Sequence, residues 1–143
     1  MPRFYGKNWH NLDQQNRLFI PAKMREGLGE RFIIYKAANG EKCLFLYSMD
    51  TWEQMTDQLN NQPPSLQLTN QQRFLHLNSD DVGTDSKGRI TINSEFCNFA
   101  GLEGETLIMG VGQRIEIWSR KEYEAMLAKA AEHIEYTNID LPL

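Results

Sequence analysis

Apolar residues gather in short runs that are typical of buried strands. The longest runs, residues 32–35 and 44–47, have the length of a strand and fall far short of a membrane span. They predict two strands, at 32–36 and 43–47, with a turn between them. Helical spacing begins after Ser48, a residue that favours helix N-caps, and runs through Trp52, Met55 and Leu59.

The same succession of features occurs twice in the chain. Residues 13–20 match residues 85–92 through a shared Asp-x-x-x-Arg, at an offset of 72 residues, and residues 44–48 match 115–119. One such match is common by chance, whereas several in the same order indicate a duplication. The sequence therefore predicts two copies of one module with a linker and a tail: a first module at 7–54, a linker with a short helix at 60–78, a second module at 82–125, and the end of a C-terminal helix with its tail at 126–143.

Each module is expected to begin with a short strand, a tight Asp-x-x-x-Arg turn and a second strand. The first strands are placed near 5–9 and 81–83, and the second strands at 18–20 and 90–92. Strand, turn and strand together predict a local hairpin. Two further strands, at 106–109 and 115–118, complete the second module.

Capping signals predict the helices. Pro21 suits a first helical position and Gly29 a helix end, while Ser94 is expected to cap the matching helix and Gly101 to end it. The linker has a Pro63-Pro64 break, and a capping box at 69–72 predicts a helix that carries Phe74, Leu75 and Leu77. Another capping box, at 119–122, begins a helix whose apolar face comprises Tyr123, Met126, Leu127, Ala130 and Ile134. Residues 136–143 have no periodicity, and we expect them to be mobile. The fold class is mixed α+β and β-rich.

The formal net charge of −4 is unevenly distributed. Residues 1–25 carry +4, and residues 26–82 and 83–143 carry −4 each. Mild overall acidity argues against strong general affinity for nucleic acid, but a basic segment on an acidic body suits local attraction to an anion. A basic end that is merely solvated is the alternative.

The duplicated Asp-x-x-x-Arg is the main candidate for chemistry. An aspartate in such a turn can accept hydrogen bonds from backbone N–H groups two or three residues on and can pair with the arginine. Gly88 suits a positive φ, and Asn16 is the next-best residue for it. The arginines could do no more than brace their turns. Alternatively, two matched loops could present two guanidinium groups to phosphates or guanine edges.

Other chemistry finds little support in the sequence. The histidines are scattered, and no phosphate loop, nucleophile elbow or zinc spacing is present, so we expect no enzyme activity, metal, cofactor or small-molecule substrate. Cys43 and Cys97 are expected to be core thiols, and Asp80-Asp81 solvated edge charges. Trp52 and Trp118, at matched ends of the two modules, are expected to serve packing rather than base stacking. The N-terminal residues contain no signal-peptide pattern, and no membrane association is expected.

Taken together, these motifs resemble the MraZ family, from Arg3 to Lys129 and in register. The residues that carry the likeness are Asp13 and Arg17 with the following Leu-Phe-Ile-Pro-Ala-Lys-Met-Arg-Glu, Cys43-Leu-Phe-Leu-Tyr, Asp85-Ser-Lys-Gly-Arg89 and Ile115-Glu-Ile-Trp-Ser. The resemblance implies two tandem AbrB-like swapped-hairpin modules (SpoVT-AbrB type) that form an intrachain pseudo-dimer. It implies ring-forming homo-oligomers, octamers or dodecamers, in the cytoplasm at the nucleoid. It also implies a repressor that binds double-stranded DNA at tandem promoter repeats ahead of its own division and cell wall gene cluster.

The resemblance also assigns roles to residues. Arg17 and Arg89 would contact DNA, with Lys87, Lys7 and Arg3 as phosphate contacts, and Asp13, Asn16, Asp85 and Gly88 would shape the loops. Asn16 stands where the family usually has Gly, and Asn93 and Cys97 where it usually has Pro and Arg. The second half therefore looks less basic, and we expect Arg89→Ala to weaken DNA binding less than Arg17→Ala. The alternative is an antitoxin-type protein-interaction module, which two full modules and a short tail disfavour.

Overall fold

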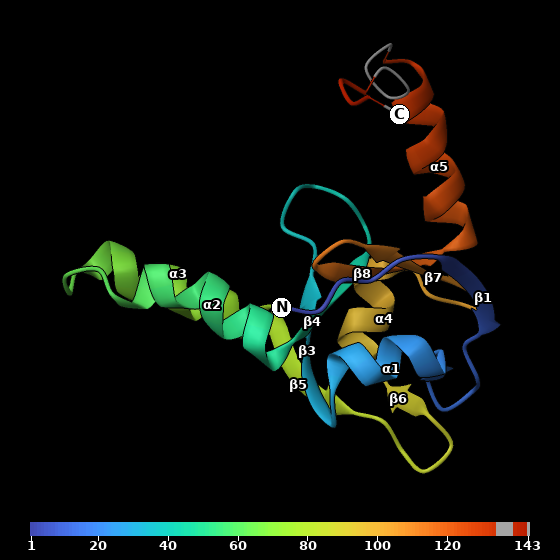
Figure 1. Cartoon of the computed structure of the whole chain (residues 1–143), viewed down its shortest axis with the longest axis horizontal. Helices are drawn as coiled ribbons and strands as arrows, with labels where there is room; N and C mark the ends of the chain where they lie inside the picture. The colour runs from blue at the N-terminus through green and yellow to red at the C-terminus, as the bar shows by residue number, and fades with distance from the viewer. Residues whose placement is uncertain (134–138, 143) are drawn as a thin grey trace.

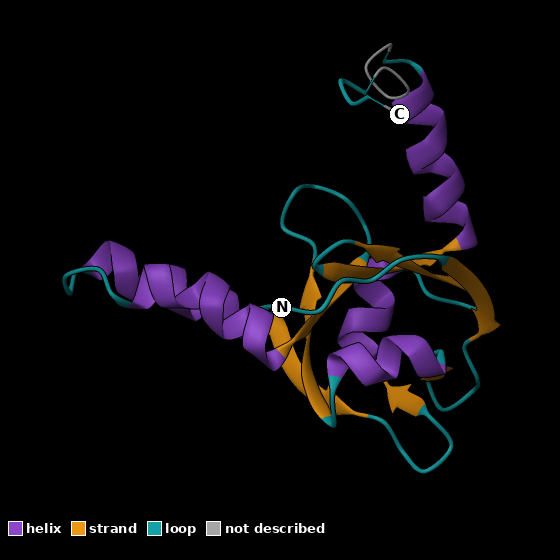
Figure 2. Cartoon of the chain, in the orientation of Figure 1, coloured by secondary structure: helices purple, strands orange, loops and turns teal. Residues whose placement is uncertain are grey.

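The computed structural model describes residues 1–133 and 139–142 (Figure 1). Eight strands and five helices are assigned in this part of the chain (Figure 2). In chain order they are β1 (Lys7–Asn11), β2 (Arg17–Phe19), α1 (Ala22–Leu28), β3 (Arg31–Lys36), β4 (Leu44–Ser48), α2 (Met49–Asn60), α3 (Leu66–Leu77), β5 (Ser79–Gly83), β6 (Arg89–Thr91), α4 (Ser94–Ala100), β7 (Glu105–Val111), β8 (Arg114–Ser119) and α5 (Arg120–Ala131). The expected mixed, β-rich fold class is confirmed.

The six-stranded antiparallel sheet is made from both modules. Its strand order is β1-β7-β8-β4-β3-β5, with β4 and β8 paired at the centre. The first strand of each module, β1 or β5, pairs with the third strand of the other, β7 or β3. The order is therefore the same when read from the centre toward either edge, as expected for an intrachain pseudo-dimer of swapped-hairpin modules.

The local hairpin expected within each module is wrong. Strand β2 pairs with β6 of the other module, with Leu18 opposite Ile90, and not with β1. The turn itself does form, since the N–H of Asn16 donates to the carbonyl of Asp13 at 3.0 Å. The exchange has a physical reason: Leu18 and Ile90 are fully buried, and pairing β2 with β6 places both of them against the common core.

Apolar residues cover both faces of the sheet. Alternation along β4 sends Leu44 and Leu46 to the face covered by α1, α4 and the β2–β6 ribbon. It sends Phe45 and Tyr47 to the opposite face, where Trp118 and the partly buried Trp52 also pack. The expectation that Trp52 and Trp118 serve packing is confirmed, with Trp118 buried and Trp52 partly buried. Cys43 and Cys97 are free, buried thiols, as expected.

Three helices project from this body. Helices α2 and α3 extend as an antiparallel pair, and α5 rises from the part of the sheet formed by β7 and β8 (Figure 1). Ser48 and Ser119 cap α2 and α5 as expected, by accepting the N–H of Thr51 and Glu122. Of the apolar face expected on α2, Met55 is exposed.

Two expected helix caps are wrong. Asn93, not Ser94, caps α4, because its extended backbone lets Oδ1 accept the N–H of Phe96 at 2.9 Å. Helix α3 begins at Leu66, capped by Ser65, so the box expected at 69–72 lies inside the helix. Pro21 precedes α1 by one residue, and the expected ends at Gly29 and Gly101 are confirmed.

The remaining expectations differ little from the structure. All the expected strands are present, with ends shifted by one or two residues, as is usual for boundaries read from sequence. Asp80 and Asp81 lie exposed on the edge strand β5, as expected, where Asp81 pairs with Arg31 at 2.8 Å. Ile134 and residues 136–138 and 143 lie outside the described residues. None of the described helices has the length and apolarity needed to cross a membrane.

Candidate nucleic-acid interface

The β2–β6 ribbon has an inner and an outer face. In its three-residue register, Leu18 lies opposite Ile90, Arg17 opposite Thr91, and Phe19 opposite Arg89. Because residues opposite each other share a face, burial of the middle pair turns the other four side chains outward. Arg17 and Arg89 are thus diagonal neighbours on the outer face, at a Cα separation of roughly 7–8 Å.

The first loop is held by the carboxylate of Asp13. Its Oδ1 accepts the backbone N–H of Gln15 at 2.9 Å and of Arg17 at 2.8 Å, two and four residues on. Its Oδ2 accepts Nε–H of Arg17 at 2.7 Å, and Nη2 of the same arginine donates to Oε1 of Gln15 at 2.7 Å. Asn16 takes the expected positive φ, at 60°. One aspartate therefore fixes both the backbone of the loop and the direction of its arginine.

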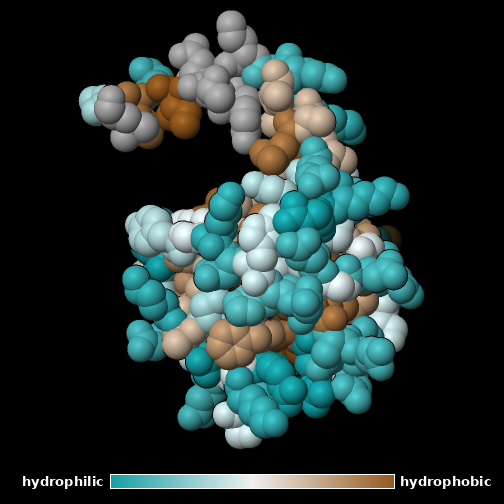
Figure 3. All heavy atoms as spheres, turned by 90° about the vertical axis from the view of Figure 1, so that its right-hand side faces the viewer, coloured by the Kyte–Doolittle hydropathy of each residue, from teal (hydrophilic) through white to brown (hydrophobic). Residues whose placement is uncertain are grey.

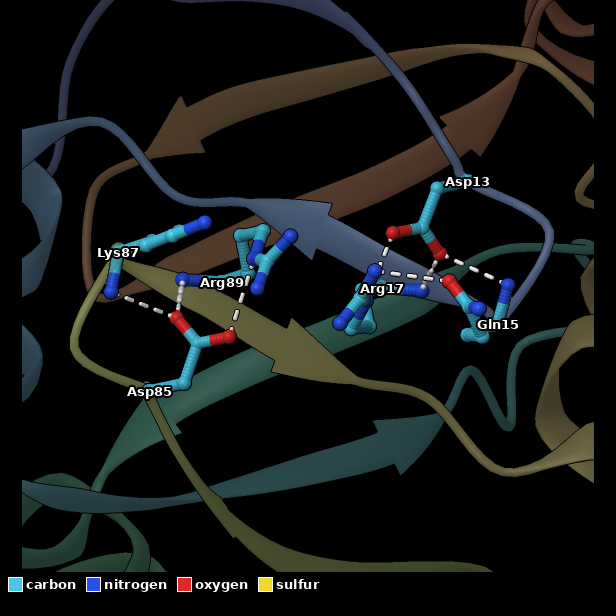
Figure 4. Close-up of polar contacts among 6 residues, drawn as sticks. All are labelled: Asp13, Gln15, Arg17, Asp85, Lys87 and Arg89. Atoms are coloured by element: carbon cyan, nitrogen blue, oxygen red, sulfur yellow. Dashed lines mark hydrogen bonds and ion pairs between the residues drawn. The ribbon is translucent and has the colours of Figure 1, made fainter.

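The second loop repeats this geometry (Figure 4). Oδ1 of Asp85 accepts the N–H groups of Lys87 at 2.9 Å and Arg89 at 3.0 Å, and Oδ2 accepts Nε–H of Arg89 at 3.0 Å. Gly88 has the expected positive φ, at 79°. No described residue accepts a hydrogen bond from Nη1 or Nη2 of Arg89, which leaves that edge of the guanidinium open. Figure 4 shows both arginines between the two aspartates.

Each loop is also tied to the other module. The N–H of Ile20 donates to the carbonyl of Gly88, and the N–H of Ile92 donates to the carbonyl of Asn16, both at 2.9 Å. The two loops are therefore held at opposite ends of one short ribbon, and neither loop is positioned by its own module alone.

Backbone hydrogen bonds keep both aspartates charged. The N–H of Arg17 holds the pKa of Asp13 below its usual range, and the arginine side chain adds to the effect. The N–H of Arg89 lowers the pKa of Asp85 in the same way. Each loop thus contains an ion pair. The side chain of Arg17 is 33% exposed and that of Arg89 is 26% exposed. An incoming acceptor would reach guanidinium groups whose direction is already set.

The structure brings together only some of the expected site residues. Lys87 is exposed beside Arg89, within the second loop. Lys7 begins β1, about 13 Å from its other end by strand rise, and Arg3 precedes it. These two side chains therefore stand apart from both loops, and their contact with DNA stays a prediction.

Arg25 is a neighbour of the site that sequence reasoning missed. It lies on α1 of the first module, yet its guanidinium packs against Gly88 of the second loop and over the ring of Phe19. The only signal in the sequence was its place in the basic segment 1–25, because the contact depends on the exchange of strands.

The surroundings are mostly polar. The side of the molecule that carries β1 is mainly hydrophilic, with small apolar patches (Figure 3). Within residues 1–133 and 139–142, no group of three or more His, Cys, Asp and Glu side chains is placed to hold a metal ion. The arrangement can therefore donate hydrogen bonds and supply positive charge to a polyanion.

Comparison with known proteins gives the family. The family model described as "MraZ protein, putative antitoxin-like" matches the chain twice, over residues 4–74 and 75–139. The chain belongs to the MraZ family. It is 37% identical over 127 residues to the transcriptional regulator MraZ of Acetivibrio thermocellus, which covers 85% of each chain. It is 37% identical over 137 residues to the protein of that name from Pelotomaculum thermopropionicum, covering 92% of this chain and 90% of the relative. It is 35% identical over 133 residues to the one from Desulforamulus reducens, covering 92% of both.

Proposed function

We propose that the chain is a sequence-specific, DNA-binding transcriptional regulator that represses its own division and cell wall gene cluster at tandem promoter repeats. The carrying observation is the pair of Asp-x-x-x-Arg loops at the two ends of one ribbon, with Arg17 and Arg89 on its outer face. The name of the relatives, transcriptional regulator MraZ, supports the same function. Repression by DNA binding needs no catalytic step, and it would take place at the nucleoid in the cytoplasm.

The shape of the ribbon suits the major groove. B-DNA accepts a two-stranded β-ribbon there, and an arginine can donate two hydrogen bonds to the O6 and N7 of one guanine. Arg89 offers an open guanidinium edge for such a contact, while Arg17 would have to release Gln15 to offer both terminal nitrogens. Lys87 would bind phosphate and set register, and Lys7 and Arg3 would bind phosphates farther along.

The test is a titration of labelled DNA from immediately upstream of the gene. Arg17→Ala and Arg89→Ala should each weaken binding by about 5- to 150-fold, the range for loss of one bidentate base contact. Lys121→Ala, which removes an exposed charge from α5, outside both the ribbon and the α2–α3 pair, is the control and should bind as the unaltered chain does. If both loop variants keep full affinity, the ribbon is not the DNA-binding surface.

We also propose that the chains form a ring-shaped homo-oligomer through the α2–α3 pair. Several large apolar side chains of this pair are exposed, with Leu66 at 74%, Leu77 at 73%, Phe74 at 50% and Met55 at 45%. Light scattering during gel filtration should give an octamer or dodecamer for the unaltered chain and smaller species for Phe74→Glu. Gln58→Glu, which adds the same charge to an exposed position of α2 that does not line the depression around Phe74, is the control. If the oligomer of the Phe74→Glu chain has the same mass as that of the unaltered chain, the contact between chains does not lie at this surface.

An antitoxin-type protein-interaction module is the second candidate, and the description of the family model favours keeping it. The exposed apolar residues of α2 and α3 would then hold a different protein. Recovery of a stoichiometric protein partner, together with no binding of upstream DNA, would support this function over the first one.

A further inference from the structure

The guanidinium of Arg25 lies over the aromatic ring of Phe19 and beside Gly88. Its Cζ lies 5.4 Å from the ring centroid of Phe19. A Cβ built on Gly88 would lie 2.6 Å from Nη1 and 2.8 Å from Cζ of Arg25, so only a residue without a side chain leaves this space open. A flat cation with two apolar faces fits such a slot, whereas the rounder ammonium of lysine does not.

No described residue neutralises this cation. The side chain of Arg25 has no ion pair or hydrogen bond with the described residues, and its buried Nε is without a partner among them. An unsatisfied buried donor is costly, so the contact must be favoured by stacking or by a partner outside the chain. The other charged residues that line the same depression as Arg25 are acidic, namely Glu26 and Glu30.

The first loop lacks this arrangement. At the offset of 72 residues, Cys97 stands in the place of Arg25 and Asn16 in the place of Gly88. Cys97 points inward, with Sγ 3.6 Å from the carbonyl of Ile92, and Asn16 brings a side chain where Gly88 has none. Gln15 likewise stands where the second loop has Lys87. The two loops share their aspartate and arginine but differ in what packs against the turn.

We infer that Arg25 is a positioning residue of the second loop. Its guanidinium braces the Gly88 turn against Phe19 and adds the positive charge that this loop needs beside the acidic strand β5. The first loop works without such a residue. Arg25 therefore belongs to the first module in sequence but adds its positive charge to the loop of the second module. For this reason, the net charge of each module's sequence does not give the net charge around its loop. This inference rests on the proposed function.

The test is a set of double-mutant cycles with the full chain and a fluorescein-labelled duplex of the upstream region. Arg25→Ala should weaken binding by about tenfold, and adding it to Arg89→Ala should cost less than about twofold more, because both changes disable one loop. Arg25→Ala added to Arg17→Ala should weaken binding by the same factor of about ten as it does alone, because Arg17 belongs to the other loop. Equal penalties in both backgrounds would overturn the inference, since a general structural defect affects both loops alike.

A second variant keeps the test sharp if Arg25→Ala destabilises the chain. Gly88→Asn copies the residue of the first loop, tolerates the positive φ and displaces the guanidinium while Arg25 remains. It should reproduce the loss seen with Arg25→Ala, and combining the two should add less than about twofold. Compared with Arg25→Ala, Arg25→Lys should restore the salt dependence of DNA binding but only part of the affinity. Lysine keeps the positive charge but lacks the planar guanidinium. If the variants at Arg25 and at Gly88 all bind within twofold of the unaltered chain, the inference about Arg25 is overturned and the proposed function stands. If the unaltered chain itself fails to bind the duplex, the proposed function is overturned as well.

Discussion

Leu18 joins the β2–β6 ribbon to the core, and its truncation gives a quantitative test of the swapped pairing. The side chain is fully buried opposite Ile90, which belongs to the other module. Leu→Ala at such a site costs about 2–5 kcal/mol, from lost burial and the cavity that remains. A chain of 143 residues has an unfolding entropy of roughly 0.3 kcal/mol/K, so the midpoint should fall by about 7–17 °C.

The assay is thermal unfolding followed by circular dichroism at one protein concentration, because the proposed assembly of the chains would make the midpoint concentration-dependent. Thr91→Ala is the control: it lies exposed on the outer face of the same ladder and should cost less than about 1 kcal/mol. Ile90→Ala should resemble Leu18→Ala, and both should keep one cooperative transition, because each module holds strands of the other. A transition that splits in two, or a Leu18→Ala midpoint within about 2 °C of the unaltered chain, would refute the swapped core.

Two further predictions concern titrating groups. Burial raises the pKa of the Cys43 and Cys97 thiols, so neither should react with Ellman's reagent in the native chain at pH 8, and both should react in denaturant; fast native labelling would contradict their burial. Backbone N–H groups lower the pKa of Asp13 and Asp85, so their stabilising effect is complete above the unfolded-state pKa of about 3.9 and is lost as pH falls through the lower folded value. Urea titrations should therefore show the double Asn variant less stable than the unaltered chain at pH 7, with a difference that shrinks as pH falls below about 3.9, and a difference of the same size at pH 7 and pH 2 would contradict this account.

Local signals in the sequence were sufficient to locate the elements. Strand β4 was predicted from an apolar run, and α2 from a capping serine followed by helical spacing, because the residues that decide these elements are neighbours in the chain. The positive φ of Asn16 and Gly88 was predicted for the same reason. Where two adjacent residues could cap, as at Asn93 and Ser94, the sequence did not distinguish them, since the backbone of each residue decides which side chain accepts the bond.

Long-range partners could not be predicted in this way. A turn between two strands favours a local hairpin, yet β2 pairs with β6 because the gain comes from burying Leu18 and Ile90 together. The contact between Arg25 and Gly88 depends on that exchange, which is why the candidate site from the sequence omitted it. The family resemblance assigned Lys7 and Arg3 to phosphate contacts near the loops, but β1 carries them away from the ribbon.

The differences between the loops also bear on the kind of DNA that such a chain would read. In a dimer of identical chains, both loops are equal, and the preferred site has the same two-fold symmetry as the protein. A duplication within one chain removes that constraint, and here the turns contain Asn16 and Gly88, packed by different neighbours. Under the proposed function, each chain therefore prefers a site with direction rather than a palindrome. Chains related by rotation around a ring all face the same way, so they would match short repeats in direct orientation, and inverting alternate repeats in the upstream DNA should abolish the gain in affinity from multiple sites.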